Sequence, residues 1–160
     1  MAKAKMVLGW CIPVVLITVA LLTPAVAQAK SLTIWPDQLR PAEPSSGYYQ
    51  DFFEIRNGVF NTPLTLPVGA RITKITYYHR GYSGGFTALY IYRVKMGSAP
   101  EDVAMQASDD SSGDIIPLDV PISVDPPGDP IIRPGYRYYI HAELLNDSSC
   151  ILGVKISYKE

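Results

Sequence analysis

The sequence contains very little cysteine: Cys11 and Cys150 are the only two among 160 residues. Cys11 lies in an apolar N-terminal segment directly after Trp10, which is too large for the lipobox of a lipoprotein. If this N-terminal segment is cleaved, Cys150 is the only cysteine left. A single cysteine excludes an internal disulfide, so packing must hold the domain together. Cys150 follows the alternation of an apolar row, which favours a buried, inert thiol over an intermolecular disulfide.

Positive charge and histidine are also scarce. The chain has 14 Lys and Arg against 15 Asp and Glu, a formal net charge of −1, and its basic residues form no cluster. No nucleic-acid partner is predicted, because binding a phosphate backbone needs a basic surface. His79 and His141 are the only histidines and lack a clustered third ligand, so no zinc site and no cofactor are expected. Each histidine is predicted to lie at the surface, solvated or hydrogen-bonded.

The first 29 residues have the pattern of a secretory signal peptide. Lys3 and Lys5 form a basic start, an apolar run covers residues 6–22, and small residues occupy positions 25–27. A retained membrane anchor is the alternative, since the run nearly reaches the length of a membrane span. We predict a cleaved signal peptide over residues 1–29 and one domain over residues 30–160. The domain would be secreted, extracellular or periplasmic, with no membrane attachment after cleavage.

Helical periodicity is absent, and alternation of apolar and polar residues takes its place. Residues 136–158 alternate on both sides of a polar turn at 145–149, which predicts a half-buried antiparallel hairpin. Pairing Leu144 with Cys150 in this hairpin would place His141 opposite Gly153. The predicted inward row is Tyr136, Tyr138, Ile140, Ala142 and Leu144, resumed by Cys150, Leu152, Val154, Ile156 and Tyr158.

Further strands are predicted upstream. Residues 71–80 and 86–94 form a second hairpin around a glycine-rich turn, with a β-bulge between Ile72 and Ile75 because their spacing of three breaks the alternation. Residues 48–55 carry aromatic side chains on both faces, which predicts a strand that is covered on both sides or lies at a subunit contact. Short strands separated by Pro and Gly predict an all-β, single-domain antiparallel β-sandwich or jelly roll.

Three stretches of the sequence resemble those of a known group of proteins. The runs Leu-Pro-Val-Gly-Ala-Arg-Ile-Thr-Lys-Ile-Thr-Tyr-Tyr at 66–78 and Leu-Tyr-Ile-Tyr-Arg at 89–93, with the closing segment, resemble a group of poorly characterised secreted bacterial β-sandwich proteins. The resemblance spans residues 62–158. It implies a jelly-roll-like fold and export, and it implies neither a catalytic activity nor site residues.

Two short motifs suggest chemistry that their surroundings do not support. Residues 81–85, Gly-Tyr-Ser-Gly-Gly, match the G-x-S-x-G nucleophile elbow, but that elbow joins a strand to a helix, and both flanks here are predicted strands. Ser83 is therefore expected in a glycine loop, and the protein is predicted not to be an enzyme. The acidic run 109–114 lacks the ligand spacing and closing glutamate of a calcium loop, so a solvated turn is favoured over calcium binding.

Tyrosine is the residue in excess, with 11 in the chain. Tyrosine suits a pleated surface that is half apolar and half wet, and exposed tyrosine is enriched at interfaces. The predicted function is a structural or adhesive subunit that forms a homo-oligomer or binds a cell-surface protein or glycan. The alternative is a carbohydrate-binding module that uses surface tyrosines. The candidate interaction residues are Tyr48, Tyr49, Tyr78, Tyr82, Arg137, Tyr139, His141 and Glu143.

Overall fold

The computed structural model describes residues 28–42, 49–50, 54–81, 84–109, 112–122, 130–145 and 148–160, and of residues 49–50 it describes the backbone. Several predictions concern residues outside these ranges. They are the signal peptide up to residue 27, Tyr48, Tyr82, Ser83, and the centre of the acidic run. Among the described residues, no helix has the length and hydropathy to cross a membrane.

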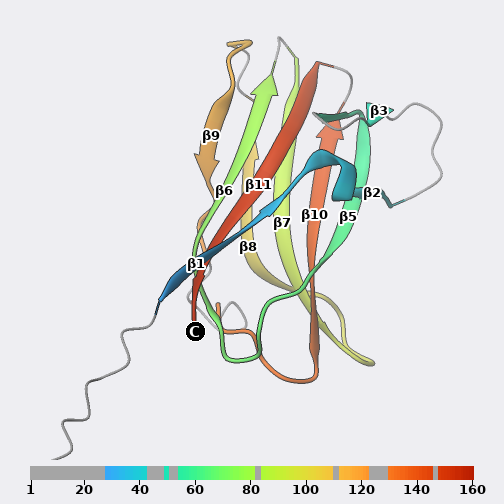
Figure 1. Ribbon diagram of the computed structural model, residues 1–160. Helices are drawn as coiled ribbons and strands as arrows, with labels where there is room; N and C mark the ends of the chain where they lie inside the picture. Colours follow the sequence, from blue (N-terminus) through green and yellow to red (C-terminus); the bar gives the residue numbers. More distant parts are fainter. Residues whose placement is uncertain are drawn as a thin grey trace, which may run out of the picture.

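The described strands form two antiparallel sheets packed face to face (Figure 1). The sheet that we call the β11 sheet has the order β3 (Tyr49–Gln50), β4 (Ile55–Arg56), β11 (Ser149–Lys159), β6 (Arg71–Gly81) and β9 (Ile116–Asp119), and β1 (Ala29–Ile34) also pairs with β11. The β10 sheet has the order β2 (Arg40–Pro41), β5 (Gly58–Leu64), β10 (Tyr136–Leu145), β7 (Phe86–Lys95) and β8 (Glu101–Ser108). A 3₁₀ turn, η1 (Pro36–Gln38), follows β1.

The eight longer strands have the order of a jelly roll. The β11 sheet contains β1-β11-β6-β9, and the β10 sheet contains β5-β10-β7-β8. Counted along the chain, these orders are 1-8-3-6 and 2-7-4-5, so most consecutive strands alternate between the sheets. The predicted all-β antiparallel sandwich is confirmed.

Both predicted hairpins are wrong in their pairing. β10 pairs with β5 and β7, whereas β11 pairs with β6, β1 and β4, so the two arms of the closing segment lie in opposite sheets. β6 and β7 are separated in the same way. Leu144 therefore does not pair with Cys150, and His141 does not lie opposite Gly153. Alternation shows that one face of each strand is buried, but it does not show whether the next strand lies beside it or across the core.

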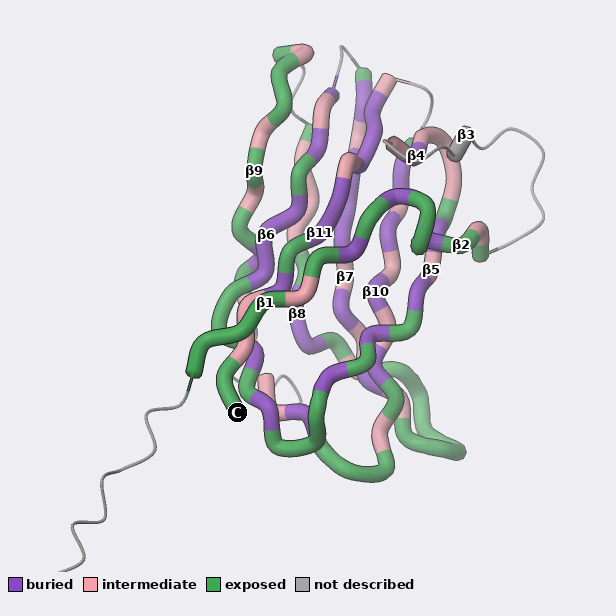
Figure 2. Tube along the Cα trace, viewed as in Figure 1, coloured by how far each residue is buried: buried purple, intermediate pink, exposed green. Residues whose placement is uncertain are grey.

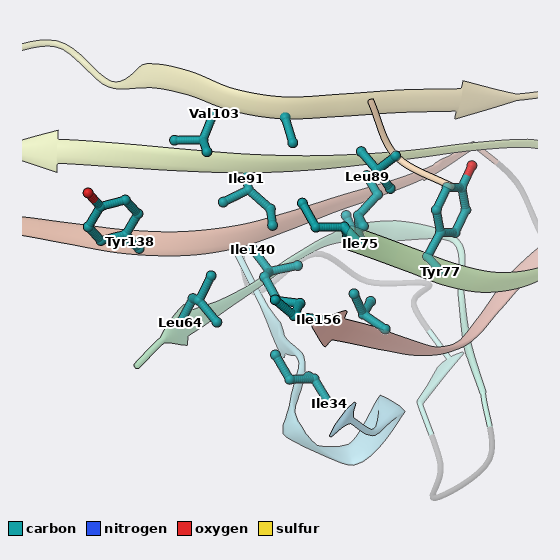
Figure 3. Close-up of a cluster of buried hydrophobic side chains, with 14 of the residues drawn as sticks. Ile34, Leu64, Ile75, Tyr77, Leu89, Ile91, Val103, Tyr138, Ile140 and Ile156 are labelled. Carbon is teal, nitrogen blue, oxygen red and sulfur yellow. The ribbon is translucent and has the colours of Figure 1, made fainter. Parts of the chain in front are cut away.

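The inward rows of the two sheets make one core. The predicted inward row of β10 is confirmed, since Tyr138, Ile140, Ala142 and Leu144 are all buried. Figure 3 shows Ile75, Tyr77 and Ile156 of the β11 sheet gathered with Leu89, Ile91 and Ile140 of the β10 sheet. Burial of these side chains is the main force that holds the sandwich together.

The predicted bulge in β6 is confirmed. Lys74 pairs with Ser157 and Ile72 with Tyr158, which leaves Thr73 as the extra residue. The Thr73 hydroxyl donates a hydrogen bond of 3.1 Å to the carbonyl oxygen of Ser157. The extra residue keeps Ile72 and Ile75 on the buried face although they are three positions apart.

A second bulge, in β11, was not predicted. Ile151 pairs with His79 and Gly153 with Tyr78, so Leu152 is the extra residue. Ile151 consequently lies in the core at 0% exposure, whereas Leu152 is half-buried and lines a hollow on the outer face. The predicted inward row of β11 is therefore wrong at Leu152, because the bulge moves Ile151 inward instead.

Cys150 lies beyond this bulge and pairs with Arg80 rather than with a core residue. Its thiol is buried, as predicted. Burial raises the pKa of the Cys150 thiol, and the neighbouring Glu54 adds to the effect. A protonated, enclosed thiol is a poor nucleophile.

Residues 48–55 do not form one strand. β3 and β4 pair with each other, Tyr49 with Arg56 and Gln50 with Ile55, so the chain reverses between them. Asn57 then takes the left-handed conformation (φ +47°), which accompanies the passage from β4 in one sheet to β5 in the other. The prediction of a single two-sided aromatic strand is wrong, and with it goes the reason for expecting a subunit contact there.

Candidate functional site

The outer face of the β11 sheet presents three rows of side chains across its strands. Residues paired between antiparallel strands project to the same face, so each row can be followed from strand to strand. From the polar end to the aromatic end, the rows are Ser31, Ser157 and Lys74; Thr33, Lys155, Thr76 and Asp119; and Gly153, Tyr78 and Pro117.

An apolar hollow of about 480 Å³ lies at the aromatic end of these rows. Three large hydrophobic side chains there remain in water: Trp35 is 58% exposed, Ile115 55% and Tyr78 37%. Gly153 also lines the hollow, and a Cβ at this position would lie 3.3 Å from the carbonyl oxygen of Ile34, so glycine permits the close approach of β1. The lining residues are Thr33, Trp35, Tyr78, Ile115, Leu152, Gly153, Val154 and Lys155.

A polar hollow of about 430 Å³ continues from the apolar one, and Tyr78 and Lys155 line both. Its other lining residues are Lys74, Thr76, Pro117, Asp119 and Ser157. We call the two hollows together the β11 groove. It lies over strands that Figure 1 shows side by side, and Figure 2 shows β1 mostly exposed and β9 alternating between exposed and intermediate.

Asp119 is held in place at the polar end. Its carboxylate lies 3.0 Å from Lys74 Nζ and accepts a hydrogen bond of 2.8 Å from the Thr76 hydroxyl. These hydrogen bonds, from Lys74 first and then from Thr76, lower the pKa of Asp119 below its ordinary value. Asp119 is therefore an anion at neutral pH, and any stability it adds is lost only as the pH falls through its lowered pKa.

Trp35 is positioned by the end of β1. The ring of Pro36 restricts Trp35 to an extended conformation (φ −88°, ψ 160°) as η1 begins. The Trp35 backbone N–H donates a hydrogen bond of 2.9 Å to Gln38 Oε1. These constraints fix the Trp35 backbone beside the groove, while its side chain stays exposed.

The predicted outward row of β10 lies on the opposite side of the sandwich. Arg137 is exposed, and Tyr139, His141 and Glu143 are half-buried on the outer face of the β10 sheet. His141 is hydrogen-bonded, as predicted: its Nδ1 lies 2.7 Å from Asn61 Oδ1 and its Nε2 lies 2.9 Å from Glu143 Oε1.

Aromatic rings on this β10 face pack against one another. The Tyr90 and Tyr92 rings are nearly parallel, at 9°, with centroids 5.5 Å apart. The His141 ring contacts both, with centroids 5.6 Å from Tyr90 and 5.5 Å from Tyr92. Their ring faces are therefore engaged with each other, in contrast to the exposed Trp35 in the β11 groove.

Burial raises the pKa of Tyr92 to about 12, and Asp102, Tyr90 and Glu143 add to the effect in that order. We expect one tyrosine of the folded protein to ionise about two pH units above the ordinary value of 10.0. The neutral form is favoured in the folded state, so this contribution to stability is complete below pH 10 and is lost as the pH rises towards about 12. Phenolate absorbance, recorded against pH for the native protein and for Tyr92→Phe, measures this step. A step that is unchanged in Tyr92→Phe would contradict the assignment.

His79 lies differently from the prediction. It belongs to the inward row of β6, is 1% exposed, and its ring centroid lies 5.4 Å from that of Tyr77. The prediction of a surface histidine is wrong here, because Ile75, Tyr77 and His79 alternate on the buried face of β6. No group of three or more potential metal-ligating side chains occurs among the described residues.

The predicted interaction residues do not form one surface. Tyr78 lies in the β11 groove, whereas Arg137, Tyr139, His141 and Glu143 lie on the far side of the sandwich. Tyr49 belongs to β3 at the edge of the β11 sheet, and Tyr48 and Tyr82 lie outside the described residues.

The sequence prediction missed Trp35, Ile115 and Leu152 as groove residues. Trp35 had a usable signal: it is the only tryptophan after the predicted signal peptide, and the proline behind it prevents the strand from continuing. Leu152 had none, because alternation placed it in the core.

Comparison with known proteins assigns no family. No family model matches the chain, and no curated protein matches it in sequence. Among solved structures, the xylan-binding module CBM15 is similar, with a TM-score of 0.46 and 12% sequence identity over 80% of this chain and 97% of that one. A likeness of this degree says nothing about ligand or site, and the jelly-roll assignment rests on the strand pairing itself.

Proposed function

We propose that the protein is a non-catalytic carbohydrate-binding module and that a glycan chain binds in the β11 groove. One observation carries the proposal. The exposed rings of Trp35 and Tyr78 line an apolar hollow that shares Tyr78 and Lys155 with a neighbouring polar hollow. Secretion and the absence of catalysis stay predictions that accompany it.

A sugar has an apolar side and a polar side, which match the apolar and the polar hollow. A pyranose ring has a face of C–H groups with partial positive charge, which packs on the negative π face of an aromatic ring. Its edge carries hydroxyl groups that need donors and acceptors. Trp35 and Tyr78 supply the stacking surfaces, and Lys74, Thr76 and Asp119 supply the polar groups. Apolar walls with a few placed polar groups are typical of small-ligand sites.

The groove lies on the outer face of the β11 sheet. It lies over β1, β11, β6 and β9, which contribute successive side chains to each row. A chain of several sugars can therefore contact more than one row, whereas a single sugar reaches only part of it. Self-association, which was predicted from residues 48–55, stays an untested prediction without that support.

Affinity electrophoresis through gels that contain soluble polysaccharides tests the proposal. We expect at least one polysaccharide to retard the protein, and Tyr78→Ala to reduce the retardation. Tyr139→Ala is the matched control, because it makes the same change on the outer face of the opposite sheet. No retardation by a broad panel of neutral and acidic polysaccharides, with the protein folded by circular dichroism, would overturn the proposal.

A further inference from the structure

Lys155 occupies the centre of the β11 groove. On β11 it is paired with Thr33 of β1 on one side and with Thr76 of β6 on the other. Its side chain is exposed and lines both hollows. A ligand that contacts the aromatic end and the polar end must therefore pass the Lys155 ammonium group.

The charges that line the groove do not balance. The charged residues are Lys74, Lys155 and Asp119. Asp119 is already engaged by Lys74 at 3.0 Å and by the Thr76 hydroxyl at 2.8 Å. None of the ion pairs in the described part of the chain includes Lys155. The groove thus presents one uncompensated positive charge on a protein whose formal net charge is −1.

We propose that the ligand is an anionic glycan, a uronate-bearing polysaccharide whose carboxylate pairs with Lys155. This inference rests on the proposed function. The carboxylate of a uronic acid is attached at the edge of the sugar ring, so one sugar can stack on Tyr78 and still direct its charge to Lys155, which shares both hollows with Tyr78. The ammonium–carboxylate hydrogen bond is charge-assisted and stronger than one to a neutral hydroxyl.

The surroundings of Lys155 favour a carboxylate over a sulfate or phosphate group. Recognition of those groups typically uses clusters of cationic side chains or bidentate arginine. The charges of the β11 groove are lysine and aspartate, with no arginine among its lining residues, and Lys74 is committed to Asp119. One free ammonium group beside threonine hydroxyls suits a single carboxylate.

Calorimetric titration with pairs of polymers tests the inference. The ligands are polygalacturonate, alginate and glucuronoxylan, each with its carboxyl-reduced counterpart, and a sulfated polysaccharide for comparison. For a uronate chain that binds, we expect the acidic form to bind on the order of fivefold more tightly at low salt, and the difference to shrink as salt is raised. Lys155→Gln should abolish the difference, because the acidic and the reduced form then meet the same neutral side chain. Lys159→Gln removes the same charge further along β11, outside both hollows, and should preserve the difference.

The two proposals fail in different ways. Equal affinity for acidic and reduced chains would overturn the anionic ligand and leave glycan binding standing. Retention of the preference in Lys155→Gln would overturn the role of Lys155, and tighter binding of the sulfated chain than of every uronate chain would overturn the choice of a carboxylate. Failure of every uronate chain to bind in either form, while another polysaccharide of the panel retards the protein, would overturn the anionic ligand alone, and failure of the whole panel would overturn both proposals.

Discussion

Trp35→Ala is expected to weaken glycan binding tenfold or more while the protein stays folded. The Trp35 side chain is 58% exposed and borders the apolar hollow, so its removal takes away a stacking surface without opening the core. Truncation of an aromatic hot-spot residue typically costs about 2 kcal/mol or more of binding free energy. Substitution of an exposed side chain usually changes the free energy of unfolding by about 0.5 kcal/mol or less.

Calorimetric titration of native protein and Trp35→Ala with the best-retained polysaccharide measures the effect. Trp35→Phe should recover part of the affinity, because it restores a smaller ring. Met96→Ala is the control: Met96 is 95% exposed and lies in the turn after β7, so its loss should leave binding unchanged. Native affinity in Trp35→Ala would remove the aromatic end of the groove from the binding site.

Ile151→Ala and Leu152→Ala are expected to differ sharply in stability. Ile151 is fully buried in the core, so its truncation leaves a cavity and should lower the free energy of unfolding by about 2–5 kcal/mol. Leu152 is the half-buried extra residue of the bulge and lines the apolar hollow, so its truncation should cost less than about 1.5 kcal/mol. Leu152→Ala should instead reduce glycan affinity.

Urea denaturation midpoints for the two variants, compared at equal slope, test this contrast. Both substitutions remove aliphatic carbons from adjacent positions of one strand, so each is the control for the other. A larger loss of unfolding free energy for Leu152→Ala than for Ile151→Ala would show that Leu152 faces the core, as uninterrupted alternation predicts, and would contradict the bulge.

The sequence sufficed for the strands and for the class of fold. Alternation correctly predicted the buried row of β10, and the spacing of Ile72 and Ile75 correctly predicted the bulge in β6. The sequence did not show which strands pair with each other. β10 and β11 bury their apolar rows in the same core from opposite sheets, and a period of two is identical for strands that pair and for strands that face each other.

The candidate site was less predictable than the fold. Tyr78 was correctly placed at a surface, but its neighbours in the groove come from β1, β11 and β9, which are distant in the sequence. The second bulge concealed Leu152, because Cys150, Ile151 and Leu152 are all apolar and their order does not show which of them faces the core. Lys155 appeared only as one polar residue in an alternating strand. That Lys155 takes part in none of the ion pairs of the described residues is visible only in the folded sheet.

The emission of Trp35 tests the central claim most directly. Trp35 is the only tryptophan after the predicted signal peptide, so the fluorescence of the cleaved protein reports on the β11 groove alone. Titration with a bound polysaccharide should shift the emission to shorter wavelength as the exposed ring is covered, and the shift should saturate with the dissociation constant found by calorimetry. Calorimetric saturation with unchanged emission would show that the glycan binds elsewhere, and it would contradict the assignment of the groove.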